Sequence, residues 1–176
     1  MANIYNLFKF LEDKKGKKIP FKLKLIHAPE TIEKEDLNVE GFLDLASTPI
    51  SSLPDNLKVG GNLDLAFTPI SSLPDNLKVR GDLFLYKTKI SSLPDNLKVG
   101  GYLNLRNTPI SSLPDNLTVK GSLYLYGTKI SSLPDNLKVE RSLFLENTPL
   151  AEKYSEEQIR KMIEEKGGEV KAGIHT

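Results

Sequence analysis

The chain offers few side chains that could carry out chemistry. Aspartate recurs every 20 residues, and a column of carboxylates is the kind of group that attracts a cation (Asp55, Asp75, Asp95, Asp115 and Asp135). Ser-Ser pairs precede these aspartates, but a nucleophilic serine needs a neighbouring base, and His27 and His175 both lie outside residues 41–150. Cysteine is absent, which excludes a disulfide framework, thiolate metal sites and a cysteine nucleophile.

Turn formation explains the aspartates better than metal binding does. Asp-Asn after Leu-Pro is typical of a bend in the chain. Lysines follow three residues later and can neutralise the carboxylates (Lys58, Lys78, Lys98 and Lys138). The two columns therefore cancel, and the formal net charge is only +1. We predict no metal, no cofactor, no enzymatic activity and no nucleic-acid partner.

A strict internal repeat dominates the sequence. The segment Ser-Ser-Leu-Pro-Asp-Asn-Leu occurs unchanged at 51–57, 71–77, 91–97, 111–117 and 131–137. Each rung, counted from Gly41, reads Gly-x-Leu-x-Leu-x-x-Thr-x-Ile-Ser-Ser-Leu-Pro-Asp-Asn-Leu-x-Val-x, and a truncated copy ends at Leu150. A period in this range indicates a solenoid. The alternation in Leu-x-Leu and Leu-x-Val points these apolar residues inward, with Gly and Leu-Pro-Asp-Asn at the corners.

The repeat resembles the leucine-rich-repeat family, on residues such as Leu63, Leu65, Thr68, Ile70, Leu73 and Pro74. The resemblance covers about 21–150 and is closest to the short repeats of bacterial translocated effectors and of bacteriophage and gut-bacterial proteins. It implies a right-handed, mostly β solenoid with a parallel sheet, of the α/β class. It also implies a microbial origin and an action on a host or competitor protein. Asn-Leu-x-Val-x-Gly replaces the family's second Leu-Pro, so the convex side is either a second sheet or extended coil.

We predict one domain over 1–176, with four parts. Residues 1–20 form an N-terminal helical cap, 21–40 a degenerate first rung, 41–150 the regular repeats, and 151–176 a C-terminal helical cap and tail. Leu23, Leu25, Leu37 and Val39 keep the phase of the repeat in the degenerate rung. The first helix, over 3–14 with Asn3 as N-cap, has Ile4, Leu7, Phe8 and Leu11 at helical spacing. Ser155 to Gln158 form a capping box before Ile159, Met162 and Ile163. We expect the apolar residues of both helices to cover the ends of the core.

The rungs differ from one another mainly at outward positions. Of the 13 Phe and Tyr residues, eight lie in the regular rungs, and none occupies an inward position. An exposed aromatic cluster usually marks an interaction site. We therefore predict a protein-binding face in which Tyr86, Arg106 and Tyr126 stack. The residues of this face are Phe84, Tyr86, Tyr102, Arg106, Tyr124, Tyr126 and Phe144.

Two alternative roles for the aromatic residues stay open. The rings could serve as platforms for sugar rings, with Asn62, Asn104 and Asp82 meeting the hydroxyls. They could also stabilise the sheet by stacking between rungs.

The N-terminus does not resemble a secretory signal. It lacks a basic leading region, and Lys9 and Glu12 interrupt its apolar residues. We therefore expect a cytoplasmic protein without membrane contact. The sequence does not fix the oligomeric state, and we favour a monomer.

Overall fold

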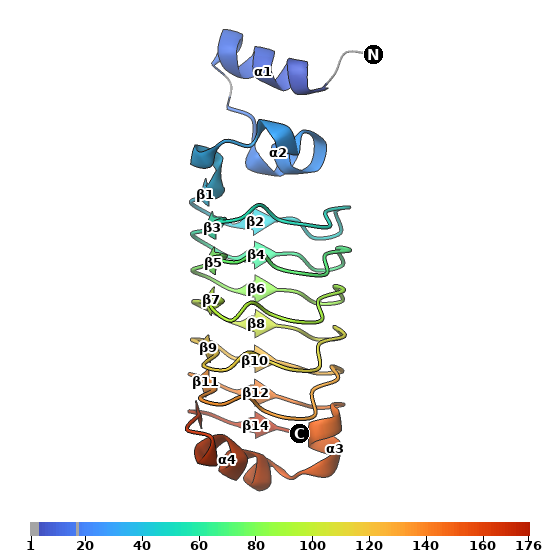
Figure 1. Ribbon diagram of the computed structural model, residues 1–176, viewed down its shortest axis with the longest axis vertical. Helices are drawn as coiled ribbons and strands as arrows, with labels where there is room; N and C mark the ends of the chain where they lie inside the picture. The colour runs from blue at the N-terminus through green and yellow to red at the C-terminus, as the bar shows by residue number, and fades with distance from the viewer. Residues whose placement is uncertain (1–3, 17) are drawn as a thin grey trace.

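The computed structural model is a β-solenoid with helices at both ends (Figure 1), and it describes residues 4–16 and 18–176. Two parallel sheets of seven strands form two walls of the rod. Sheet A contains β1 Asn38–Val39, β3 Lys58–Val59, β5 Lys78–Val79, β7 Lys98–Val99, β9 Thr118–Val119, β11 Lys138–Val139 and β13 Glu169–Val170. Sheet B contains β2 Leu43–Asp44, β4 Leu63–Asp64, β6 Leu83–Phe84, β8 Leu103–Asn104, β10 Leu123–Tyr124, β12 Leu143–Phe144 and β14 Ile174–His175.

Each repeat contributes one strand to each sheet, in register with its neighbours. Leu43 pairs with Leu63, which pairs with Leu83, so equivalent residues stack at roughly 4.8 Å along the rod. The sequence left two possibilities for the wall opposite the Leu-x-Leu strands, a second sheet or extended coil, and the structure has a second sheet.

The core consists of the inward residues of the repeat. In the rung that starts at Gly61 these are Leu63, Leu65, Ile70, Leu73, Leu77 and Val79, all buried. Thr68, buried beside them, donates its Oγ1 hydrogen bond to the carbonyl of Leu65 at 2.7 Å, and the equivalent threonines of the other rungs do the same. The threonine thus closes the turn after Leu-x-Leu within its own rung.

The C-terminal end is closed by two helices and a final pair of strands. The short helix α3, Pro149–Lys153, begins where Thr148 accepts a hydrogen bond from the Ala151 amide. The predicted capping box opens α4, Glu156–Glu165, whose Ile159 and Ile163 are buried against the last rungs. The tail then adds β13 and β14, one to each sheet, and their Val170 and Ile174 are buried.

The N-terminal end differs from the predicted degenerate rung. Residues Phe21–His27 form a helix, α2, followed by the 3₁₀ turns η1 Pro29–Thr31 and η2 Lys34–Leu37, and only Asn38–Val39 joins a sheet. Leu23 and Leu25 therefore do not form a Leu-x-Leu strand. Phe21 and Leu25 are one helical turn apart and pack on the open end of the core, while Leu23 is exposed.

The first helix, α1 Ile4–Lys15, forms an outer layer beyond α2 (Figure 1). Its Phe8 packs with Ile19 and Ala28 in a small core separate from that of the rungs. Ile4 and Leu7, predicted to cover the core, are exposed instead, because α2 already occupies that place. The predicted N-cap, Asn3, lies outside the described residues.

A buried ion pair ties these N-terminal elements together. The Lys24 Nζ lies 2.8 Å from Asp36 Oδ2 and 2.9 Å from Glu12 Oε1, and the lysine is 3% exposed. Burial alone would raise the pKa of the Asp36 carboxyl, but the hydrogen bonds from Lys24 and from the Glu33 amide outweigh it, so the pKa is lowered. Burial alone would lower the pKa of Lys24, but its bonds to Asp36 and Glu12 outweigh that effect, so this pKa is raised.

The two faces of one strand should respond differently to truncation. Leu85→Ala removes a fully buried side chain and should lower the free energy of unfolding by about 2–5 kcal/mol. The adjacent Phe84→Ala acts on an outward, half-buried ring and should cost less than about 1 kcal/mol. Urea titration of the two variants checks this, and a reversed order would show that the faces are assigned wrongly.

The ion pair should make stability depend on pH in the acid range. Because the pKa of Asp36 is lower in the folded state than its ordinary 3.8, its contribution is fully present above about pH 4 and is lost as pH falls through the folded pKa. Asp36→Asn should therefore lower the free energy of unfolding by about 3 kcal/mol at pH 7, and this deficit should shrink on acidification. Urea titrations from neutral to acidic pH measure it, with the exposed Asp55→Asn as control. A deficit that does not change with pH would contradict the assignment.

Candidate interaction face

The predicted face is formed by the outward residues of sheet B. Positions two, four and six of each rung lie beside the inward leucines and point to the opposite side of the sheet. In-register pairing aligns the fourth positions into one column along the rod, which runs Asp44, Asp64, Phe84, Asn104, Tyr124, Phe144 and His175. Six of the seven predicted residues are aromatic, and the structure places them on four successive rungs of this one sheet.

Rings near the C-terminal end of the column stack on one another. Tyr124 and Phe144 are parallel, with centroids 4.6 Å apart, and Phe144 stacks on His175 at 4.4 Å. Tyr102, at position two, meets the ring of Tyr124 edge-on at 6.2 Å. Much of the surface of these rings therefore contacts rings of neighbouring rungs. His175 joins the column because the tail forms β14, and the repeat pattern alone contains no signal for it.

A second cluster lies two to three residues further along each rung. Tyr86 packs edge-on against Phe67 of the preceding rung, with centroids 5.1 Å apart. The Lys87 ammonium lies 5.3 Å from the centre of the Tyr86 ring and 5.5 Å from that of Phe67. We call Phe67, Tyr86 and Lys87 the Phe67 cluster. Phe67 is 54% exposed, which makes it one of the most open aromatic rings among the described residues.

The predicted Tyr86–Arg106–Tyr126 stack is only half formed. The Arg106 guanidinium lies over the Tyr126 ring at 5.5 Å. Tyr86 turns instead toward Phe67, on the opposite side from Arg106. Neither Lys87 nor Arg106 has a carboxylate within ion-pair distance among the residues that the structure describes. Both cations are thus held by rings and remain available to an anionic group.

Backbone strain marks the position of Phe67. Position seven of each rung has a left-handed backbone, with φ of 59° at Phe67 and 54° at Lys87. The other rungs have Ser47, Asn107, Gly127 and Asn147 there, and most of these tolerate the conformation better. A bulky side chain in this conformation costs on the order of 1–2 kcal/mol. Sequence reasoning missed Phe67 and Lys87 as site residues, although they are the exceptions in a column of small and turn-forming residues.

The polar residues considered for sugar hydroxyls already bond to the backbone. Asn62 Oδ1 accepts from the Asp82 amide at 2.8 Å, and Asp82 Oδ1 accepts from the Tyr102 amide at 2.8 Å. Asn104 Oδ1 accepts from the Arg106 amide at 3.2 Å. These side chains therefore support the rungs, which leaves fewer oxygen atoms for a ligand.

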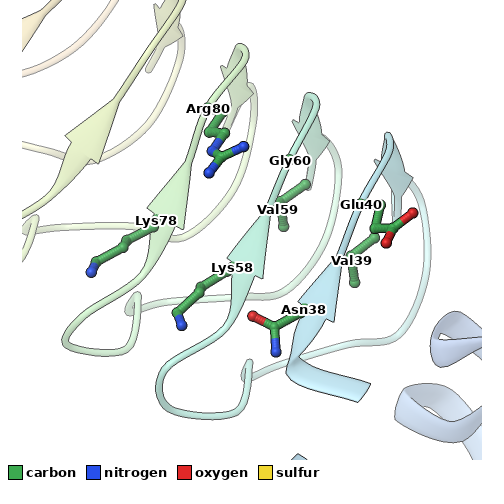
Figure 2. Close-up of a pocket in the computed structure, with 8 residues that line it drawn as sticks. All are labelled: Asn38, Val39, Glu40, Lys58, Val59, Gly60, Lys78 and Arg80. Atoms are coloured by element: carbon green, nitrogen blue, oxygen red, sulfur yellow. The ribbon is translucent and has the colours of Figure 1, made fainter. Parts of the chain in front are cut away.

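Sheet A carries a different surface, a hollow of ≈ 590 Å³ at its N-terminal end (Figure 2). Lys58 projects from β3, Lys78 and Arg80 project from or directly after the neighbouring strand β5, and Glu40 and Gly60 also line the hollow. The expected neutralisation of the lysines by Asp55 and Asp75 does not take the form of ion pairs in the described part of the chain. The hollow has no aromatic lining, and we assign no ligand to it.

No group of three or more metal-binding side chains occurs in residues 4–16 and 18–176. Within the same residues no helix is both long and apolar enough to cross a lipid bilayer. Comparison of the sequence and structure with protein-family models, curated proteins and solved structures found no match.

The stacked rings should contribute more to stability than the isolated ones. Phe144→Ala removes two parallel contacts, with Tyr124 and His175, whereas Phe84 has no ring partner among the described residues. Each aromatic pair contributes about 0.5–1.5 kcal/mol beyond simple burial. Phe144→Ala should therefore lower the free energy of unfolding by at least about 1 kcal/mol more than Phe84→Ala does. Urea titrations measure both variants. If Phe144→Ala and Phe84→Ala lower the free energy of unfolding equally, the stack does not contribute to stability as argued here.

Proposed function

We propose that the protein is a non-enzymatic protein-binding module of the leucine-rich-repeat type, with a right-handed coil, whose partner binds the aromatic face of sheet B. The partner that we propose is a host or competitor protein, by resemblance to bacterial and bacteriophage repeat proteins. The proposal is carried by one observation, the exposed rings and ring-bound cations of the Phe67 cluster and of the Arg106–Tyr126 pair.

Interfaces concentrate their binding energy in a few aromatic and arginine side chains. In this protein such residues lie close together on one rigid sheet, so little conformational entropy would be lost when a partner binds. The left-handed φ of Phe67 supports the same proposal, because a bulky residue is strained in that conformation and more than half of its surface stays exposed beyond its contacts with Tyr86 and Lys87.

The rings divide into two sets with different roles in this proposal. Tyr124, Phe144 and His175 stack on each other and chiefly stabilise the C-terminal rungs. Tyr86 and Tyr126 instead each hold a cation, and neither stacks in parallel on another ring of the described residues. We therefore expect the centre of the interface between Phe67 and Tyr126.

Carbohydrate binding is the second candidate, favoured by the exposed tyrosines, since sugar rings pack on aromatic faces. The hydrogen bonds of Asn62, Asp82 and Asn104 to the backbone speak against it. A glycan array separates the two functions. A carbohydrate-binding protein should bind at least one glycan and lose that signal in the Tyr86→Ala variant, whereas a protein-binding module should show no such signal.

Removal of two tyrosines should abolish capture of the partner. The double variant Tyr86→Ala with Tyr126→Ala takes the rings away from Lys87 and Arg106 but leaves the leucine core intact. In affinity purification from the native cell extract, we expect it to lose the bands that the unaltered protein recovers. Its melting temperature should stay within a few degrees, because outward substitutions cost little.

The matched control alters sheet A. Lys58→Ala with Lys78→Ala changes two exposed residues on the other wall and should leave capture unchanged. If the tyrosine variant melts much earlier and still recovers the same proteins, its rings are structural and the binding face lies elsewhere.

A further inference from the structure

Exposed apolar side chains gather at the N-terminal end of the rod. Ile4, Leu7 and Phe10 of α1 are 38%, 50% and 51% exposed, and Leu23 of α2 is 42% exposed. We call the three residues of α1 the N-terminal tip. The regular rungs show no comparable group of open aliphatic side chains among the described residues. Water-exposed apolar groups that lie together usually mark a contact surface.

The fold explains why this apolar group is left open. The solenoid core is already covered by Phe21, Leu25 and Ile26, and α1 buries only Phe8 in its own small core. Residues 4, 7 and 10 follow a spacing of three, so they form a stripe along one side of α1. In Figure 1 α1 lies at the extreme end of the rod, beyond α2, where another surface can reach it.

Lysines accompany the apolar stripe. Among residues 4–23 whose side chains the structure describes, Lys9, Lys14, Lys18 and Lys22 stand against Glu12 and Asp13. Glu12 is already engaged by Lys24. Lys9, Lys14 and Lys22 have no ion pair among the described residues. The end of the rod is therefore both apolar and basic.

The sequence alone predicts no membrane contact, but on these observations we propose that the N-terminal tip docks on an anionic lipid bilayer. A short amphipathic helix with lysines beside an apolar stripe lies in the plane of the bilayer interface, where its apolar side chains enter the acyl boundary and its cations meet acidic headgroups. A second copy of the chain is a poorer occupant, because two basic ends repel each other. Surface docking needs no spanning helix, and this chain has none among its described residues.

Vesicle co-sedimentation tests the proposal with the full chain. The probes are vesicles of phosphatidylcholine alone and vesicles in which about one third of the lipid is phosphatidylglycerol. We expect sedimentation with the anionic vesicles at low salt, several-fold less at high salt, and little with phosphatidylcholine alone. Leu7→Asp with Phe10→Asp should reduce the bound fraction about tenfold, since it removes apolar contact and adds negative charge.

The control variant is Phe42→Asp, which changes a similarly exposed phenylalanine of the first regular rung, outside both proposed surfaces, and should bind vesicles like the unaltered protein. Circular dichroism and melting curves should be unchanged in the double variant, because both substituted side chains are open to water. No sedimentation with anionic vesicles, or sedimentation that the double variant retains, would overturn the proposal. Light scattering that shows a dimer without lipid would also overturn the proposal if the double variant is monomeric, because the tip would then bind a second copy of the chain. Sedimentation that a soluble acidic polypeptide, poly-glutamate, abolishes at equal charge would overturn it in favour of an acidic protein partner.

Discussion

The structure depends on the in-register stacking of one rung on the next. A two-residue strand has almost no stability alone, and a single rung buries its leucines only against neighbouring rungs. Because the period is 20 residues without insertion, every inward side chain meets its own equivalent above and below. The same register aligns the outward residues. The leucine columns of the core and the aromatic column of sheet B are therefore consequences of one constraint.

Register also explains why the two ends need special structures. A final rung exposes leucines on its open side, and the chain covers them in two ways. At the C-terminus α4 packs on the rungs, and Arg160 fixes the tail by donating to the carbonyls of Val170 and Ala172. At the N-terminus α2 covers the core, and Lys24 holds α1 and η2 to it through Glu12 and Asp36. A buried ion pair contributes geometry more than net stability, which suits a layer that has little core of its own.

The sequence predicts what is repeated and fails where a segment occurs once. Five copies of Leu-Pro-Asp-Asn define the corners, the inward leucines and the period. The apolar residues of 21–27 fit both the alternation of a strand and the spacing of a helix. The segment forms a helix because it lies at the end of the core, where Phe21 and Leu25 pack on it. The half-formed stack has a similar cause. Tyr86 has a ring on one neighbouring rung, Phe67, and a cation on the other, Arg106, and its ring packs on Phe67. No spacing rule contains that information.

The two surfaces that we propose lie on different parts of the rod. Sheet B runs along its side, whereas α1 lies beyond its end (Figure 1). The Phe67 cluster belongs to the rungs that start at Gly61 and Gly81, so only the rung of β2 and the α2 layer lie between it and the N-terminal tip. Docking of the tip would thus leave the aromatic face open to water, with its N-terminal rungs nearest the bilayer. A stiff stack of rungs fixes that arrangement, because no flexible linker separates the repeats from one another.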